Sequence, residues 1–223
     1  MQSTRVMRAS GAAGVLAAVL ILGGLYLATA WGRPGIDADG AALAAYAQRE
    51  ELAIETGVYV LLVPGLLLFL CMFAALAGLL RSNAISTRLA GYGALAFFVF
   101  FATAGVLSST TASAFGFYNG FEDPTAVTVF TGLSAGYHLQ FVGVWSLAAT
   151  MLATAVALRN AAAISPRWFV ASIALAALAV AASFVGFGVI PCLVWILAVA
   201  IGLLRWTPAR SAAIDSTAEA VPN

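Results

Sequence analysis

The stretch that decides the fold is WFVASIALAALAVAASFVGFGVIPCLVWILAVAIGLL, residues 168–204. It contains no charged side chain. A helix that crosses the hydrocarbon core of a bilayer needs about 20 apolar residues, so this run is long enough for two helices. Gly186-Phe187-Gly188 is a turn signal near its middle, and Pro191 follows it. The run therefore predicts two membrane-spanning helices, at about 168–185 and 189–205, joined by a tight turn.

The composition of the whole chain favours a membrane location. Of its 223 residues, 63% are hydrophobic and 9% are charged, whereas a soluble domain has about 25% charged residues. The net charge of +1 gives no sign of the clustered basic face that a nucleic-acid partner requires. All basic residues are arginine, which with the many alanines and glycines is typical of a high-GC bacterial genome. We therefore expect a bacterial cell-membrane protein whose main partner is the lipid bilayer, with no nucleic acid.

Four further apolar runs precede this stretch. They cover about residues 11–31, 57–80, 89–109 and 137–158. Pro64 predicts a kink in the second of them, because proline removes a backbone hydrogen bond. Before the fourth, the small residues of 132–136 predict a break in a helix that begins near Pro124, in preference to a helix that projects from the membrane. The fold class is therefore all-α, a single polytopic bundle of six transmembrane helices over 1–206, with a disordered tail at 207–223.

Charge placement gives the six-span bundle an orientation. All arginines except Arg33 and Arg49 fall on the side of the two termini, and all acids except Asp215 and Glu219 fall on the opposite side. Short loops rich in arginine stay in the cytoplasm. We therefore expect both termini to be cytoplasmic in a multi-pass protein of the inner or plasma membrane. The first run ends in Ala28-Thr29-Ala30, which resembles a signal-peptidase site, so cleavage is the alternative to a retained first helix.

The outer loop and the cysteines give further signals. The pattern at about 41–55 is typical of a helix that lies on the membrane before the chain turns into it. Cys71 and Cys192 both lie in apolar runs, at a spacing that makes neither a metal motif nor a disulfide framework. We therefore expect both to be small buried side chains. Trp195 lies well inside the last span, so its side chain should face the bundle.

The polar residues most able to carry chemistry gather at the outer mouth of the fourth span. His138 is the only histidine of the chain, and an imidazole held by a carboxylate acts as a base or proton carrier. Glu55, the last acid before the second span, is its best partner, and Glu122 and Asp123 are alternatives. An interfacial histidine bonded to water or to a loop carbonyl is the structural alternative. The vestibule or polar-site candidates are His138, Glu55, Tyr59, Gln140 and Ser134.

Hydroxyl groups continue inward from this site. Ser146, Thr150 and Thr154 recur at intervals of four residues, and they either bond to backbone carbonyls or line a polar track. A zinc site requires three or four ligands, which one histidine and scattered acids do not supply. A single histidine also excludes two-histidine haem ligation within one chain. We therefore expect no metal, no cofactor and no catalytic residue set.

Several segments together resemble a family of uncharacterised bacterial six-helix integral membrane proteins that carry a domain of unknown function. The segments are Gly65–Phe69, Leu79-Leu80-Arg81, Ser165-Pro166-Arg167-Trp168, Pro191, Trp195 and Gly202-Leu203-Leu204. The resemblance implies a six-helix membrane fold, and no activity comes with it.

Three functions remain open at this point. The leading hypothesis is a non-enzymatic accessory, regulatory or interaction subunit, with a membrane-protein partner or a second copy of the chain. The second is a channel or a carrier of small solutes or lipids, with an outer vestibule built from the candidates above. The third is a membrane enzyme in which His138 and Glu55 form an acid–base pair. The lack of charged residues in the middle of the spans lowers the expectation of ion-coupled transport.

Overall fold

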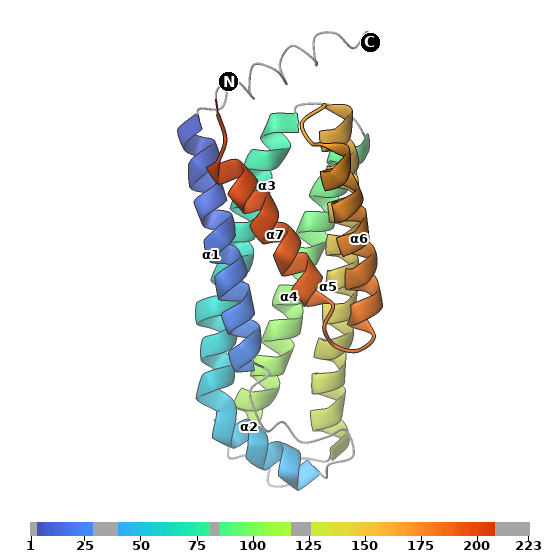
Figure 1. Ribbon diagram of the computed structural model, residues 1–223. Coiled ribbons are helices and arrows are strands. Elements are labelled where there is room, and N and C mark those ends of the chain that lie inside the picture. The colour runs from blue at the N-terminus through green and yellow to red at the C-terminus, as the bar shows by residue number, and fades with distance from the viewer. Residues whose placement is uncertain (1–3, 29–39, 81–84, 117–125, 208–223) are drawn as a thin grey trace. The chain divides into compact units, whose positions relative to one another are not determined.

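The protein, seen here as a computed structural model, is built from helices (Figure 1). The structure describes residues 4–28, 40–80, 85–116 and 126–207. The helices are α1 (Thr4–Ala28), α2 (Gly40–Glu55), the π-helix η1 (Thr56–Leu62), α3 (Val63–Leu80), α4 (Ile85–Gly116), α5 (Ala126–Asn160), α6 (Pro166–Ser183) and α7 (Val189–Leu204). Thr29, Ala30, Glu122, Asp123 and the tail from residue 208 are outside the described residues, so the predictions made for them remain predictions.

The helices are long and apolar, as the composition predicts. Among the described residues, five segments are long and apolar enough to cross a membrane: Thr4–Ala28, Gln48–Gly78, Ile85–Ser109, Ser134–Asn160 and Pro166–Ser183. Val189–Leu204 is a shorter apolar helix. Large apolar side chains are also exposed along these helices, for example Leu16, Val19 and Leu22 on α1. Helices that are apolar both inside and outside belong in lipid, which confirms an all-α membrane protein.

The chain forms two compact units. Unit 1 consists of Met1–Ala18, Leu67–Phe98 and Gly143–Asn223, and unit 2 consists of Val19–Leu66 and Val99–Val142. The helices α1, α3, α4 and α5 each contribute one part to each unit. The core of unit 1 includes Phe69, whose ring meets that of Phe97 edge to face at 5.3 Å. In unit 2, Val58 and Leu62 of η1 are buried, as are Ile21, Leu66 and Phe101.

The predicted hairpin at the end of the chain is confirmed in unit 1. Ser165 caps α6, because its side chain accepts a hydrogen bond from the backbone N–H of Trp168 at 3.3 Å, and Pro166 occupies the first turn. At the other end of α6 the chain reverses through Gly186, whose φ of +83° favours glycine. Trp195 of α7 is 1% exposed, so its predicted inward orientation is confirmed. Cys192 is buried, but Cys71 is exposed on the surface of α3, so the prediction for Cys71 was wrong.

The predicted helix break at 132–136 was also wrong, because α5 continues unbroken from Ala126 to Asn160. One glycine costs a helix about 1 kcal/mol, which packing offsets here. A Cβ on Gly136 would lie 3.0 Å from the Ser108 hydroxyl oxygen and 3.2 Å from the Ala104 carbonyl oxygen. The glycine thus lets α4 and α5 approach closely within unit 2. At 1.5 Å per residue, α5 is about 52 Å long and exceeds a 30 Å hydrocarbon core.

Helical structure runs without a gap from Gly40 to Leu80, through α2, η1 and α3. The predicted helix at about 41–55 is therefore confirmed, and its position on the membrane surface remains a prediction. In Figure 1 the pale-blue α2 changes direction where it meets η1. The Val63 N–H bonds to the carbonyl of Val58, five residues earlier, and Pro64 follows at once. In a regular α-helix, the ring of Pro64 would clash with the carbonyl four residues before it. The π segment widens the turn at this place and so accommodates the proline.

Candidate functional site

His138 lies on α5 in unit 2 and is exposed. Its Nδ1 is 2.7 Å from the backbone carbonyl oxygen of Ser134 and 3.4 Å from the Ser134 hydroxyl. Because a carbonyl oxygen only accepts, Nδ1 carries the proton and donates it to Ser134. In the neutral ring this leaves the Nε2 lone pair as the basic position. The imidazole is therefore held by a carbonyl of its own helix, whereas the structural alternative expected water or a loop carbonyl.

Aromatic rings flank this histidine on the same helix. The Tyr137 ring meets the His138 ring edge to face at 6.1 Å and the Phe141 ring at 4.8 Å. Tyr137 is 40% exposed. An amphipathic tyrosine beside an exposed imidazole suits the boundary between lipid and water, where rings with a polar tip are favoured.

Of the other candidates in unit 2, Ser134 and Gln140 share α5 with His138, whereas Glu55 and Tyr59 lie on other elements. Gln140 is half-buried on α5, Glu55 is the last residue of α2, and Tyr59 of η1 is 48% exposed. Among the described residues, the contacts that the structure gives the His138 ring are with Ser134 and Tyr137. The His138–Glu55 acid–base pair therefore remains a prediction. The alternative partners Glu122 and Asp123 lie outside the described residues.

Two glycines bring α1 and η1 together beside Tyr59. A Cβ on Gly57 would lie 2.8 Å from both the Ala28 nitrogen and the Gly24 oxygen. A Cβ on Gly24 would lie 2.7 Å from the Gly57 oxygen and 2.7 Å from the Leu62 nitrogen. No side chain fits between these backbones, so both positions require glycine. The π segment that carries Tyr59 is thereby fixed against α1.

The hydroxyl ridge of α5 serves helix packing in unit 1. Thr150 donates to the Ser146 carbonyl at 2.9 Å. A Cβ on Gly93 would lie 2.9 Å from that same carbonyl oxygen, so α4 and α5 are close here. Thr154 is fully buried, and within the described part of the chain its hydroxyl oxygen has no hydrogen-bond partner. The first of these contacts agrees with the packing interpretation of the ridge, and no polar track is needed to explain it.

Two tryptophans hydrogen-bond across helices to serines of α6, and the sequence analysis missed both pairs. The Trp145 indole nitrogen donates to the Ser183 hydroxyl at 3.0 Å, and Ser183 donates in turn to the Val180 carbonyl at 2.6 Å. The Trp195 indole nitrogen donates to the Ser172 hydroxyl at 3.3 Å. The pairs join α5 and α7 to α6. A buried indole N–H needs such a partner, so the buried Trp195 offered a signal, whereas Trp145, at 46% exposure, did not.

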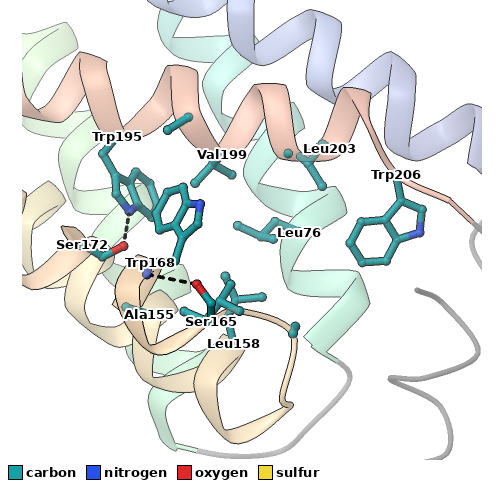
Figure 2. Close-up of a pocket in the computed structure, with 14 residues that line it drawn as sticks. Leu76, Ala155, Leu158, Ser165, Trp168, Ser172, Trp195, Val199, Leu203 and Trp206 are labelled. Carbon is teal, nitrogen blue, oxygen red and sulfur yellow. Dashed lines mark hydrogen bonds between the residues drawn. The ribbon is translucent and has the colours of Figure 1, made fainter. Parts of the chain in front are cut away.

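A cavity of about 250 Å³ lies in unit 1 among α3, α5, α6 and α7 (Figure 2). Tryptophans line much of it, with Trp195 and Trp168 towards one end in this view and Trp206 towards the other. Leu76 and Leu203 contribute apolar walls. Nothing in the sequence analysis pointed to this cavity, because its lining comes from four separate helices. It is well away in sequence from the predicted vestibule residues.

The described residues contain no group of three His, Cys, Asp or Glu side chains that could hold a metal ion. The cysteines are both free thiols. No protein-family model matches the chain, and no curated protein or solved structure matches it either. The resemblance to a bacterial six-helix family therefore remains a prediction.

Proposed function

We propose that this chain is a six-span bacterial plasma-membrane protein that acts by binding, as an accessory, regulatory or interaction subunit, and not by catalysis. The observation that carries the proposal is the use of polar groups within the spans. Trp145, Ser183, Trp195, Ser172 and Thr150 direct their polar atoms to other helices or to backbone carbonyls. Groups engaged in this way stabilise helix packing in lipid and are not free for chemistry.

In the proposed topology both termini and the arginine-rich connectors are cytoplasmic. Arg5, Arg8, Arg88, Arg159, Arg167 and Arg205 all belong to unit 1, whose described residues contain no acid. The acids Glu50, Glu51 and Glu55 belong to unit 2. This separation of charge along the same helices supports the positive-inside assignment.

Both helices of the α6–α7 hairpin are slightly shorter than the hydrocarbon core in this proposal. With 18 and 16 residues, these helices are about 27 and 24 Å long, against about 30 Å of hydrocarbon. At the turn Phe184, Val185 and Phe187 are 67%, 69% and 66% exposed. An apolar turn of this kind suits the outer acyl boundary better than open water, with slight local thinning of the bilayer.

Reconstitution tests the proposed function. The purified protein in liposomes should conduct no ions and move no small solute above the leak of empty liposomes. In native membranes it should migrate as a complex larger than the purified protein. Flux that depends on the purified chain alone would overturn the proposal.

Thiol labelling tests the proposed topology. In a Cys71→Ser/Cys192→Ser background, Leu52→Cys on α2 should react with a membrane-impermeant maleimide on intact cells, since Leu52 is 78% exposed. Ala162→Cys, in the connector after α5, should react only after permeabilisation. Labelling in the reverse order would invert the assignment.

A channel or carrier with an outer vestibule is the second candidate, favoured by one observation. The π-helix Thr56–Leu62 carries Tyr59 and follows Glu55 directly, and π segments are frequent at functional sites. If this candidate is right, Glu55→Gln and His138→Ala should each reduce flux in the reconstituted protein, while Leu52→Ala on α2 should not.

A further inference from the structure

The cavity of unit 1 is lined mostly by apolar side chains, which suits the binding of a hydrocarbon chain. Its volume of about 250 Å³ is slightly below the range of drug-sized ligand pockets, roughly 300–1,000 Å³. The hydroxyls on its wall are already engaged, Ser172 with the Trp195 indole and Ser165 with the Trp168 backbone N–H (Figure 2). An occupant therefore gains most from burying hydrocarbon against Leu76, Leu203 and the indole rings.

An open space on the cavity wall shows where such a chain fits. Gly202 of α7 lines the cavity, and a Cβ built there would meet no atom within 4 Å. Elsewhere on the helices of unit 1, Gly11, Gly14 and Gly93 are in tight contact with neighbouring atoms. Gly202 thus keeps a place empty where almost any other residue would partly fill it.

The surroundings of the cavity are strongly cationic. Arg159, Arg167 and Arg205 are exposed, and each is the sequence neighbour of a lining residue: Leu158, Trp168 and Trp206. The described part of unit 1 carries three more arginines and no acid. The N-terminus of α6 also borders the cavity, since Ser165 and Trp168 line it, and its dipole adds positive potential. An anionic group is favoured at this border.

From this combination we infer that the cavity binds one anionic glycerophospholipid. One acyl chain lies against Gly202 and the tryptophans, and the phosphate lies among the arginines. Anionic lipids enrich the cytoplasmic leaflet, and basic pockets between membrane helices recognise their headgroups. The inference goes beyond the proposed function, because it names a ligand site that an accessory subunit need not have.

Quenching of tryptophan fluorescence by phospholipids with brominated acyl chains tests the site. Trp168, Trp195 and Trp206 line the cavity, so a bound brominated chain lies against them. In detergent, brominated phosphatidylglycerol should quench the full-length protein with a saturable component, and unbrominated phosphatidylglycerol should compete. Brominated phosphatidylcholine should lack that component. Glycerol 3-phosphate at the same concentration should not compete, because it has no acyl chain.

Matched variants locate the site. Gly202→Leu should remove the saturable quenching, whereas Gly91→Leu on α4 should keep it. A Cβ at Gly91 also meets nothing within 4 Å, and Gly91 does not line the cavity, so both variants should fold, as circular dichroism and size exclusion will report. Arg167→Gln/Arg205→Gln, which leaves the shape of the cavity unchanged, should raise the Kd about tenfold. Arg5→Gln/Arg8→Gln, with the same loss of charge, should change it less than about threefold.

Any of four results would overturn the inference. They are undiminished saturable quenching in Gly202→Leu, equal saturable quenching by phosphatidylcholine, competition by glycerol 3-phosphate, and equal effects of the two arginine pairs. The first would place the lipid outside the cavity, and the third would identify a soluble phosphate as the ligand.

Discussion

Unit 1 and unit 2 share four helices but differ in their packing and in their charged residues. In unit 1, α6 is joined to α5 and α7 by tryptophan–serine hydrogen bonds, a cavity remains between helices, and the charged side chains of the described residues are all arginine. In unit 2, backbones meet at Gly24 and Gly57, a π segment replaces a regular turn, and the acids and His138 lie on the helices. Backbones also meet in unit 1, where a Cβ on Gly11 would lie 2.6 Å from the Leu204 nitrogen, but unit 1 keeps open space beside Gly202 and in its cavity. The space for a ligand and the only histidine therefore belong to separate parts of the chain.

The largest expected effect on the free energy of unfolding comes from adding one methyl group at a glycine. Gly57→Ala in unit 2 should lower the free energy of unfolding by about 3 kcal/mol, because the new Cβ would lie 2.8 Å from backbone atoms that cannot move aside. Gly202→Ala and Gly91→Ala in unit 1 should be stabilising by up to about 1 kcal/mol, since open space lets the better helix propensity of alanine act. Denaturation in mild detergent measures all three. Equal effects at Gly57 and Gly202 would remove the contrast between the units.

The next effect concerns the hydrogen bonds of unit 1. Trp195→Phe should cost about 1–2 kcal/mol, because it removes the donor to Ser172 and leaves a smaller ring in a buried site. A double-mutant cycle with Ser172→Ala separates the hydrogen bond from the packing loss. A coupling energy near zero would mean that the Trp195–Ser172 contact does not stabilise the hairpin.

A smaller effect is expected at Thr154, where a substitution should stabilise the fold. Thr154→Val replaces a buried hydroxyl that has no partner among the described residues by a methyl group of similar shape. The expected gain is about 1 kcal/mol, read as a rise in Tm. Thr150→Val is the matched control, because the Thr150 hydroxyl donates to the Ser146 carbonyl, and it should show no gain. A loss of stability in Thr154→Val would reveal a partner for that hydroxyl.

The smallest expected effect is at the histidine. His138→Ala should change stability by less than about 0.5 kcal/mol, because the side chain is exposed and its hydrogen bond is to a carbonyl of its own helix. Thermal denaturation at pH 6 and pH 8 checks this. A large loss at either pH would show that His138 is held by a partner outside its helix.

The sequence predicts part of this structure well, for physical reasons that particular residues show. Long uncharged runs demand helices in lipid, and Ser165-Pro166 and Gly186 mark the hairpin because a cap and a positive φ are local requirements. The predicted break near Gly136 was wrong because a glycine in a helix marks either a break or a close approach of two helices. Only the position of the neighbouring helix decides between the two. The tryptophan–serine pairs are 38 and 23 residues apart. Such contacts and the cavity depend on which helix faces meet, and no local pattern encodes that.

Native mass spectrometry of the protein released from membranes tests the central claim most directly, namely that ligand binding belongs to the arginine-rich unit 1 and not to the surroundings of His138. The spectrum should show one retained phospholipid on the wild-type chain. The lipid should remain in His138→Ala and Gly91→Leu and be lost in Gly202→Leu. Loss of the lipid in His138→Ala together with its retention in Gly202→Leu would contradict the claim and move the ligand site to unit 2.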